Sequence, residues 1–157
     1  MRLTKAAEYA VRCISHLAKQ GRGVVASRKE VAAATDTPPQ FLAKIAQDLS
    51  RAGLIEIRQG SKGGFVLLRD PQTVTLLEVV EAIIGEIALN DCVVSPESCP
   101  VSGGCAVNRV WEQARDQLRQ TLRQANFADF AKEDACRFLF PTTDLTVEKG
   151  EEDVEDE

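Results

Sequence analysis

The first twenty residues place apolar side chains three or four positions apart: Ala7, Ala10, Val11, Ile14, Leu17 and Ala18. This spacing predicts an amphipathic helix over residues 4–20, which the sequence "QGRG" ends. A second, shorter helix is predicted to begin after Ser27, because a serine followed three positions later by Glu30 is typical of a capping box. It should end near Asp36 after about two turns.

A third helix is predicted over residues 37–52. Thr37 is expected to cap its first turn, and Pro38 and Pro39 are tolerated there because the first amide groups of a helix have no partner within it. One face of this helix carries a hydrophobic stripe: Phe41, Leu42, Ile45, Ala46 and Leu49. The opposite face is polar, and Gly53 should end the helix in a left-handed conformation.

Two short strands follow the third helix and favour a β-hairpin. Leu54, Ile55 and Ile57 would form the first strand and residues 65–68 the second, with the glycines of "RQGSKGG" permitting positive φ at the tip. Two helices joined by a tight turn and followed by a hairpin are the element order of a winged helix-turn-helix. The sequence therefore predicts a mainly α-helical fold with a small β-hairpin, in which residues 1–70 form the DNA-binding domain.

The second half of the chain predicts two more helices on either side of a cysteine-containing loop. Thr75 and Glu78 have the spacing of a capping box at the start of the first of these helices. The second runs from Ala106 to about Gln124 and has a narrow apolar seam about 30 Å long. The seam consists of Val107, Val110, Trp111, Ala114, Leu118 and Leu122. We interpret it as a long C-terminal dimerisation helix that packs against its twin; the alternative is packing on its own domain.

This interpretation divides the chain into three parts. Residues 1–70 form the winged helix-turn-helix, residues 71–140 the cysteine loop and the dimerisation helices, and residues 141–157 an acidic tail. The tail is too charged and too poor in apolar residues to fold.

Charge is distributed unevenly, and the net value of −5 hides a basic N-terminal half. Residues 1–70 hold 12 Lys and Arg against 6 Asp and Glu, whereas residues 142–157 hold 1 against 8. A basic half is what contacts with DNA phosphates require, although an ordinary solvated surface is the alternative. No apolar run approaches the roughly 18 residues of a membrane span, and no signal peptide is visible, so we expect a cytoplasmic protein with no membrane partner.

The third helix is the candidate recognition helix, because such helices enter the major groove with their N-terminal residues against base edges. Gln40 would read adenine, and Lys44 would reach guanine or a phosphate. The start of the second helix is placed for phosphate contacts, and the hairpin tip for the backbone or the minor groove. The predicted DNA-binding residues are Ser27, Arg28, Pro39, Gln40, Lys44, Arg51, Arg58, Ser61 and Lys62. The alternative is a winged helix that serves as a protein-interaction module.

Three cysteines before the long helix are candidate metal ligands. Cys92, Cys99 and Cys105 lie in a loop whose prolines and glycines keep it irregular, so that three sulfurs can converge. Thiolates favour zinc or iron–sulfur clusters, but three are one short of a closed site. Unligated thiols or a disulfide switch between two of them are the alternatives. Cys13 is interpreted as a core residue, and Cys136 as a core residue or a loose thiol.

The residues of a catalytic centre are missing from the sequence. His16 is the only histidine, and it leaves no Ser-His-Asp or Cys-His-Asn set. A phosphate-binding loop is also absent. The sequence therefore predicts that the protein is not an enzyme.

Together these motifs resemble the Rrf2 family of bacterial winged-helix regulators, which includes the IscR, NsrR and RirA types. The resemblance rests on "MRLTKAAEYAV", "RAGLIEIRQGSKGGFVL", "TLLEVVEAI" and a third cysteine followed by the pattern x-x-N-x-x-W, and it covers about residues 1–130. It implies a homodimer that binds a near-palindromic operator in double-stranded DNA. It also implies an iron–sulfur cluster, [2Fe–2S] or [4Fe–4S], that controls DNA affinity.

The resemblance further suggests a fourth ligand beside Cys92, Cys99 and Cys105. In IscR-like members a histidine three residues after the third cysteine completes the site, and Asn108 stands at that position here. In NsrR-like members an acidic residue in the first helix of the partner subunit serves instead, and Glu8 is the matching residue. The alternative for Glu8 is an ordinary solvated acid on the helix face.

Two positions depart from the family pattern in the DNA-binding half. Gln59 precedes the wing glycine where the family often has arginine, with Arg58 one position earlier, and Ala43 replaces a glutamate of IscR. The target sequence of IscR should therefore not be assumed. The sequence as a whole predicts an iron–sulfur-dependent transcriptional repressor that responds to iron, redox or nitric oxide status. A winged-helix regulator with a structural zinc site or a thiol switch is the alternative.

Overall fold

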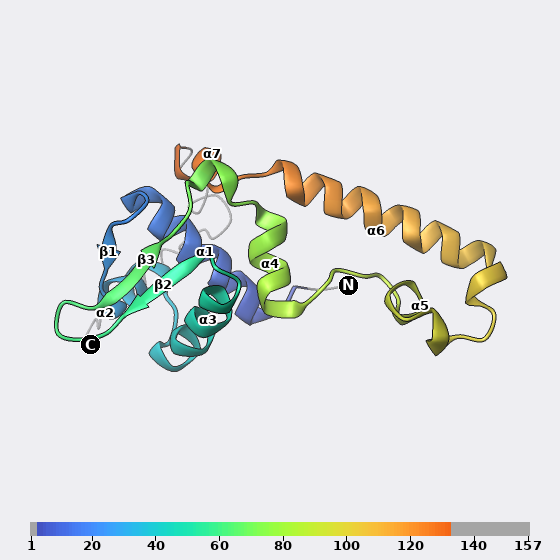
Figure 1. Cartoon of the computed structure of the whole chain (residues 1–157), viewed down its shortest axis with the longest axis horizontal. Helices are drawn as coiled ribbons and strands as arrows, with labels where there is room; N and C mark the ends of the chain where they lie inside the picture. Colours follow the sequence, from blue (N-terminus) through green and yellow to red (C-terminus); the bar gives the residue numbers. More distant parts are fainter. Residues whose placement is uncertain (1–2, 133–157) are drawn as a thin grey trace, which may run out of the picture.

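A computed structural model describes residues 3–132, which form a mainly helical fold with one small antiparallel sheet (Figure 1). The helices are α1 (Lys5–Gln20), α2 (Arg28–Thr35), α3 (Pro39–Arg51), α4 (Leu76–Ile84), α5 (Asp91–Val94), α6 (Ala106–Gln124) and α7 (Phe127–Lys132). Three short 3-10 turns, η1 (Pro71–Thr73), η2 (Pro96–Ser98) and η3 (Ser102–Gly104), lie in the connections. The predicted winged helix-turn-helix followed by a long helix is confirmed. No helix among the residues described has both the length and the apolar character needed to cross a membrane.

The sheet contains one strand more than the sequence pattern predicts. Its strands are β1 (Val25–Ala26), β2 (Ile55–Arg58) and β3 (Gly64–Leu67), in the spatial order β1-β3-β2. β2 and β3 form the predicted hairpin, with Ile55 opposite Leu67. β1 is only two residues long, which is too short to show an alternating pattern. It packs closely because Gly64 has no side chain; a Cβ at this position would collide with the backbone of Ala26.

The turn between α2 and α3 differs from the prediction. Pro38 precedes the first residue of α3, and no side chain caps this helix. Thr37 is buried, and its hydroxyl accepts a hydrogen bond of 2.8 Å from the hydroxyl of Thr35. Asp36 adopts a left-handed conformation with φ 48°, which turns the chain between the helices. The prediction of Thr37 as the cap was wrong because its side chain closes this turn instead.

The two predicted capping boxes have different outcomes. At α4, Thr75 accepts a hydrogen bond from the backbone N–H of Glu78, and the Glu78 side chain accepts one from the backbone of Thr75, so the box is complete. At α2, Ser27 accepts from the N–H of Glu30 at 3.2 Å. The Glu30 carboxylate, however, accepts a hydrogen bond from Gln20 at 3.4 Å, so only half of that box forms.

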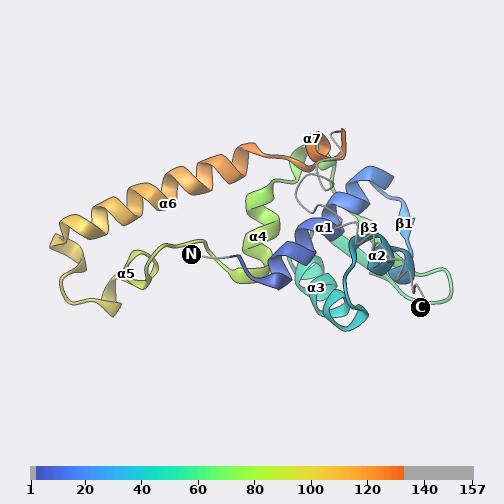
Figure 2. The same ribbon diagram turned by 180° about the vertical axis from the view of Figure 1, so that it is seen from behind.

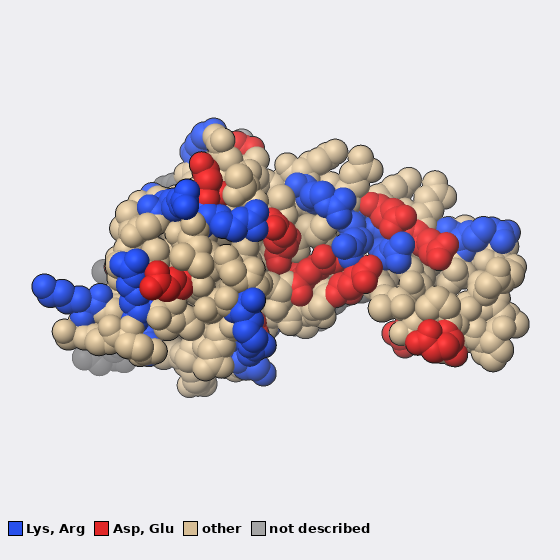
Figure 3. Space-filling view, in the orientation of Figure 1, with Lys and Arg blue, Asp and Glu red and all other residues tan. Residues whose placement is uncertain are grey.

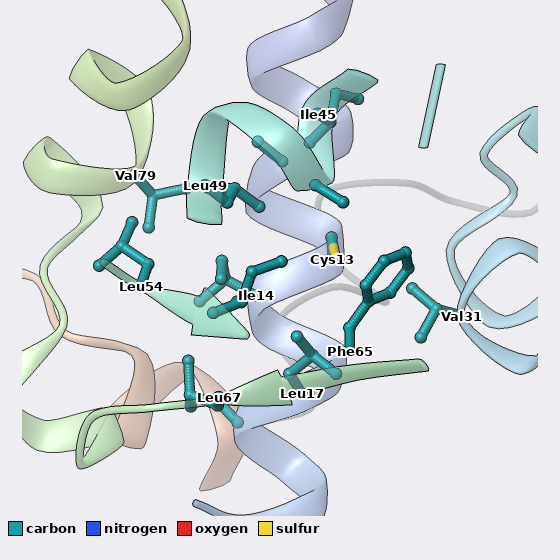
Figure 4. Packing of buried hydrophobic residues seen from close by; sticks show 14 of the residues in the cluster. Cys13, Ile14, Leu17, Val31, Ile45, Leu49, Leu54, Phe65, Leu67 and Val79 are labelled. Carbon is teal, nitrogen blue, oxygen red and sulfur yellow. The ribbon is translucent and has the colours of Figure 1, made fainter. Parts of the chain in front are cut away.

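The core surrounds α1, which α2, α3, α4, α7 and the sheet cover (Figure 4). Its labelled members are Cys13, Ile14, Leu17, Val31, Ile45, Leu49, Leu54, Phe65, Leu67 and Val79. Phe127 of α7, a helix that the sequence analysis did not predict, is also fully buried in this core. Phe41, which was predicted to belong to the stripe, is 48% exposed instead. We call α1, α2, α3, α4, α7 and the sheet the body of the molecule.

α6 leaves the body and carries the cysteine loop at its far end (Figure 1 and Figure 2). Only the last turns of α6 pack on the body, where Leu118 and Leu122 contact a small cluster around Leu77 of α4. Residues 91–116, which we call the arm, include α5, the loop and the first half of α6. The larger seam residues of the arm are exposed: Val107 by 57%, Val110 by 59% and Trp111 by 38%.

Candidate DNA-reading surface and cysteine loop

The predicted base-reading residues lie on the exposed side of α3. Pro39 is the first residue of the helix, and Gln40 and Lys44 are exposed one turn apart. Arg51, in the last turn, forms an ion pair of 3.0 Å with Asp48. The N-terminal turns of α3 thus present an amide and an ammonium group to the outside, as a recognition helix requires.

The wing and the start of α2 are joined by a contact that the sequence analysis did not predict. The guanidinium of Arg28 donates a hydrogen bond of 3.0 Å to the side-chain oxygen of Gln59. Gln59 is the residue that replaces the family arginine, so here it connects the wing to α2. Arg58 forms an ion pair of 3.2 Å with Glu56 on the same strand.

The hairpin tip carries two further predicted residues. Ser61 and Lys62 are exposed there. Ser27, in contrast, uses its hydroxyl to accept the hydrogen bond from the α2 backbone. In the space-filling view, Lys and Arg side chains appear over the body, including the end where the hairpin tip projects, with some Asp and Glu among them (Figure 3). Acidic and basic residues also mix along α6.

Phe41 is a candidate contact residue that sequence reasoning missed. The centroid of its ring lies 6.2 Å from that of Tyr9 in α1. The guanidinium of Arg12, also in α1, lies 5.6 Å from the Tyr9 centroid. An aromatic side chain that is half exposed beside Gln40 is available for apolar contact with a partner molecule. Helical spacing did not predict the exposure of Phe41, because this residue lies at the edge of the apolar stripe.

The three loop cysteines are free thiols and all are half-buried. Cys92 lies in α5, Cys99 follows η2, and Cys105 is the residue immediately before α6. Within residues 3–132, no three His, Cys, Asp or Glu side chains are grouped as metal ligands. By chemistry, three accessible thiols in one irregular loop fit a thiolate-bound metal group. By placement, the loop would have to draw its sulfurs together to hold one.

Asn108 has a specific partner in this loop. Its side-chain nitrogen lies 3.1 Å from the carbonyl oxygen of Cys92 and 3.2 Å from the Cys92 sulfur. Asn108 is also the only buried residue among the 19 residues of α6. The position at which IscR-like members have a histidine is therefore occupied here by a hydrogen-bond donor to the first cysteine.

Glu8 lies in the first turns of α1, where its carboxylate forms an ion pair of 2.7 Å with Lys5. α1 and α5 lie apart in both ribbon views, so the chain does not bring its own Glu8 to the cysteine loop (Figure 1 and Figure 2). His16 lies between α1 and α2, with its Nε2 atom 3.4 Å from Glu30. Neither residue joins the loop within one chain.

Cys13 differs from the loop cysteines in its surroundings. It is 0% exposed in the core, and this burial raises the pKa of its thiol to about 12. The interpretation of Cys13 as a core residue is confirmed. Cys136 and the acidic tail lie outside the described residues.

A recognition helix exposed beside a β-hairpin wing defines a winged helix-turn-helix protein, the class to which many DNA-binding regulators belong. The family model of Rrf2, described as "Iron-dependent Transcriptional regulator", matches residues 3–133. The chain therefore belongs to the Rrf2 family and is a transcriptional regulator. The predicted absence of an enzymatic role agrees with the family and its named members, which are regulators.

The similarity to individual proteins extends over most of the chain. A helix-turn-helix transcriptional regulator of Mycobacterium tuberculosis strain H37Rv is 34% identical over 137 residues, which cover 83% of this chain and 81% of that protein. The transcriptional repressor NsrR of Streptomyces coelicolor is 30% identical over 146 residues, or 92% of this chain and 97% of that protein. Among solved structures, CymR, the global cysteine regulator of B. subtilis, has the same fold. Its TM-score is 0.66 at 21% identity, over 84% of this chain and 97% of that chain.

Proposed function

We propose that the protein is a homodimeric repressor of the cytoplasm whose cysteine loop holds an iron–sulfur cluster and senses iron, redox or nitric oxide status. The observation that carries this proposal is the position of three free, half-buried thiols in one loop at the start of α6. The similarity to the repressor NsrR of Streptomyces coelicolor supports it. Three thiols of this kind, attached to a DNA-binding fold, suit a soft metal centre better than a structural disulfide.

DNA binding in this proposal uses α3 and the wing. α3 enters the major groove with Gln40 and Lys44 against base edges, and Phe41 makes apolar contact beside them. Arg28, Ser61 and Lys62 contact phosphates or the minor groove on either side. Ser27, Pro39, Arg51 and Arg58 complete the proposed set. Because two copies related by a two-fold axis read two half-sites, the operator is expected to be near-palindromic.

The dimer in this proposal forms through the exposed seam of the arm. Val107, Val110 and Trp111 form an apolar strip on one face of α6, and an apolar strip of this kind is buried when a second copy packs against it. The body covers the remainder of the seam through Leu118 and Leu122. Packing on the chain's own domain thus accounts for the second half of the seam, and we propose dimerisation for the first half.

The proposed ligands are Cys92, Cys99, Cys105 and Glu8 of the partner subunit. When bound, a cluster would supply a redox-active centre whose charge and integrity respond to oxidants, nitric oxide or iron shortage. The chain contributes Cys105 at the N-terminal end of α6, where the helix dipole favours a negatively charged sulfur. A carboxylate from the partner would tie cluster binding to the geometry of the dimer, and hence to the spacing of the two recognition helices.

The test of the cluster is purification without oxygen, followed by a visible spectrum and by iron, sulfide and zinc analysis per chain. We expect a coloured protein with matched iron and sulfide. Cys99→Ser should lose the colour, and Cys13→Ser, which changes a core thiol of the body, should keep it. Glu8→Gln should weaken iron retention in the dimer. A Cys99→Ser protein that holds its iron and responds normally would refute the cluster.

The second candidate is a thiol switch or a structural zinc site in the same loop. The described loop favours it in one respect, since its thiols are free and are not grouped as ligands. The structural neighbour from B. subtilis is named a cysteine regulator, which is a statement about that protein. A colourless, zinc-rich protein, or an iron-free protein whose DNA affinity changes reversibly on oxidation, would favour this candidate.

DNA binding is tested by titrating genomic fragments at several salt concentrations. We expect affinity to fall steeply as salt rises, because contacts with phosphates release bound counterions. Gln40→Ala should cost about 1–3 kcal/mol at one base pair of the selected site. Lys62→Ala should weaken binding to every sequence and reduce the salt slope by about one. Affinity that does not depend on salt would favour the protein-interaction module instead.

A further inference from the structure

We propose that Asn108 is a positioning residue that holds Cys92, and with it α5, against the first turn of the dimerisation helix. The part of this inference that concerns a cluster rests on the proposed function, because Asn108 contacts Cys92, which is a proposed ligand. The contact itself is independent of that function. It is carried by the two distances from the Asn108 amide nitrogen to the oxygen and the sulfur of Cys92, 3.1 and 3.2 Å.

The geometry fixes which end of the Asn108 amide faces the cysteine. A backbone carbonyl only accepts hydrogen bonds, so the group within 3.1 Å of the Cys92 oxygen must be the amide nitrogen. The same nitrogen carries a second hydrogen, and the Cys92 sulfur lies within reach of it. Asn108 therefore donates to the backbone and to the side chain of one residue, which restrains both its position and the direction of its sulfur.

Burial indicates that this contact is specific. The first half of α6 is otherwise exposed, with apolar Val107 and Val110 on its surface, whereas the polar Asn108 is only 7% exposed. Burying an amide without a partner would be unfavourable, so the site is stable only while Cys92 accepts its hydrogen bonds. α5 has four residues and cannot hold this place by helix formation alone.

A second contact fixes α5 to the same helix. Val93 is 6% exposed, and its carbonyl oxygen accepts a hydrogen bond of 3.4 Å from Arg115, two turns further along α6. In α5, Arg115 contacts the backbone of Val93, whereas Asn108 also reaches the sulfur of Cys92. Among the described residues of α6, Asn108 is thus the one that connects a loop thiol to the helix bearing the exposed seam.

The experiment compares Asn108→Leu, which removes both donors and keeps the branching of the side chain, with Asn108→Gln, which keeps an amide. Gln113→Leu is the matched control, because Gln113 is an exposed amide on the same helix. Hydrogen exchange of residues 91–95 is measured on reduced, iron-free protein. On iron-loaded protein, the rate of iron loss to a chelator and the reduction potential are measured.

We expect Asn108→Leu to speed both the exchange of α5 and the loss of iron at least about fivefold, because it removes both hydrogen bonds to Cys92 and the loss of one alone predicts a change of that size. The reduction potential should fall, because N–H···S hydrogen bonds favour the more negative, reduced state. Asn108→Gln should recover part of each effect, and Gln113→Leu should change none. A merely structural role would leave the potential unmoved.

Two results would overturn the proposal. Unchanged exchange of α5 in Asn108→Leu would show that the residue does not hold Cys92. Faster exchange with an unchanged rate of iron loss and an unchanged potential would reduce the contact to local packing. If the wild-type protein holds no iron, the cluster fails as a function, and the exchange of α5 alone decides the role of Asn108.

Discussion

The body and the arm place their hydrophobic residues in opposite ways. In the body, Phe65 and Ile14 are almost completely buried around α1, whereas in the arm Val110 and Trp111 face outward. Hydrophobic burial is the main stabilising contribution to a fold, so the body is stabilised by contacts within one chain. The arm lacks such a core, and in the proposed function a second copy and a metal group would supply the contacts that it does not make itself.

The cysteines of the body and the arm also differ in burial, and therefore in reactivity. Cys13 of the body is inaccessible, and burial holds its pKa near 12, far from the range in which thiols react. The arm holds Cys92, Cys99 and Cys105, each of them half-buried and free. A thiol in the body is thus a packing group, and the thiols of the arm are available for ligation or oxidation.

The largest expected effect is a difference in thiol reactivity. At pH 8 a thiol with a pKa of about 12 is ionised in about one molecule in ten thousand, and Cys13 is also shielded from reagent. In reduced, iron-free protein we expect iodoacetamide to label the arm cysteines at least about a hundredfold faster than Cys13. Peptide mass spectrometry measures the four rates. Equal rates in the folded protein would remove the distinction between the two regions.

The next effect compares two phenylalanines of opposite exposure. Phe65→Ala should lower the free energy of unfolding by about 3–5 kcal/mol, because it empties a fully enclosed site in the core. Phe41→Ala, the matched control on the exposed face of α3, should cost about 1 kcal/mol or less. Denaturant titration measures both. Similar costs would mean that Phe41 is packed in solution, and that the core extends beyond its described limits.

A third change tests the apolar surface of the arm. Trp111→Ala should weaken the dimer by about 2 kcal/mol, or roughly thirtyfold, since large aromatic side chains dominate the energy of interfaces. Sedimentation velocity at several concentrations measures the association. Glu112→Ala, an exposed neighbour on α6, serves as the control. An unaltered dimer in Trp111→Ala would place the interface elsewhere on the molecule.

The elements that could be predicted from the sequence are those whose signals are local. α6 begins and ends at the predicted residues, Ala106 and Gln124, because its start follows a loop and its seam is continuous. The hairpin followed from two apolar runs separated by glycines. β1 and α7 escaped prediction because each is short and is held by tertiary contacts, such as the burial of Phe127 against α1.

The features of the candidate site also divide into those with a local sequence signal and those without one. Exposure of Gln40, Lys44 and Lys62 follows from amphipathic spacing and from a hairpin tip, and both are readable in the sequence. The contact of Arg28 with Gln59 joins residues 31 positions apart, and that of Asn108 with Cys92 joins residues 16 positions apart. Pairs at such separations follow no periodicity, so only the folded arrangement reveals them.

A smaller effect is expected where α4 begins, within the body. Thr75→Ala removes one side of the capping box and should lower the free energy of unfolding by about 1 kcal/mol, whereas Thr75→Ser should retain most of it. Partial burial would raise the pKa of Glu78, but hydrogen bonds from Arg69 and Thr75 outweigh it and lower the pKa below its usual 4.5.

The acid dependence of this box has a definite sign. A carboxyl group whose pKa is lowered by folding adds stability above its unfolded pKa, and this stability is lost as the pH falls through the folded value. Glu78→Gln should therefore cost stability at pH 7 and leave stability at pH 2 nearly unchanged, as unfolding at the two values would show. An equal cost at both would assign the effect to packing rather than to charge.

The smallest expected effect has the opposite sign and lies where α6 begins. Cys105 occupies the N-cap position in an extended conformation but caps nothing, whereas the corresponding Thr75 of α4 makes a full box. Serine is a strong N-cap, so Cys105→Ser should stabilise the iron-free helix by about 0.5–1 kcal/mol and slow amide exchange in its first turn. Cys105→Ala is the control and should give no such gain.

The serine variant should nevertheless lose its iron, because a hydroxyl is a poor ligand for a soft metal. A protein that gains stability and loses iron through one substitution would show that this position is kept for ligation at the expense of the helix. Retained iron with normal colour would remove Cys105 from the ligand set and leave α6 with a weak cap that ligation does not explain.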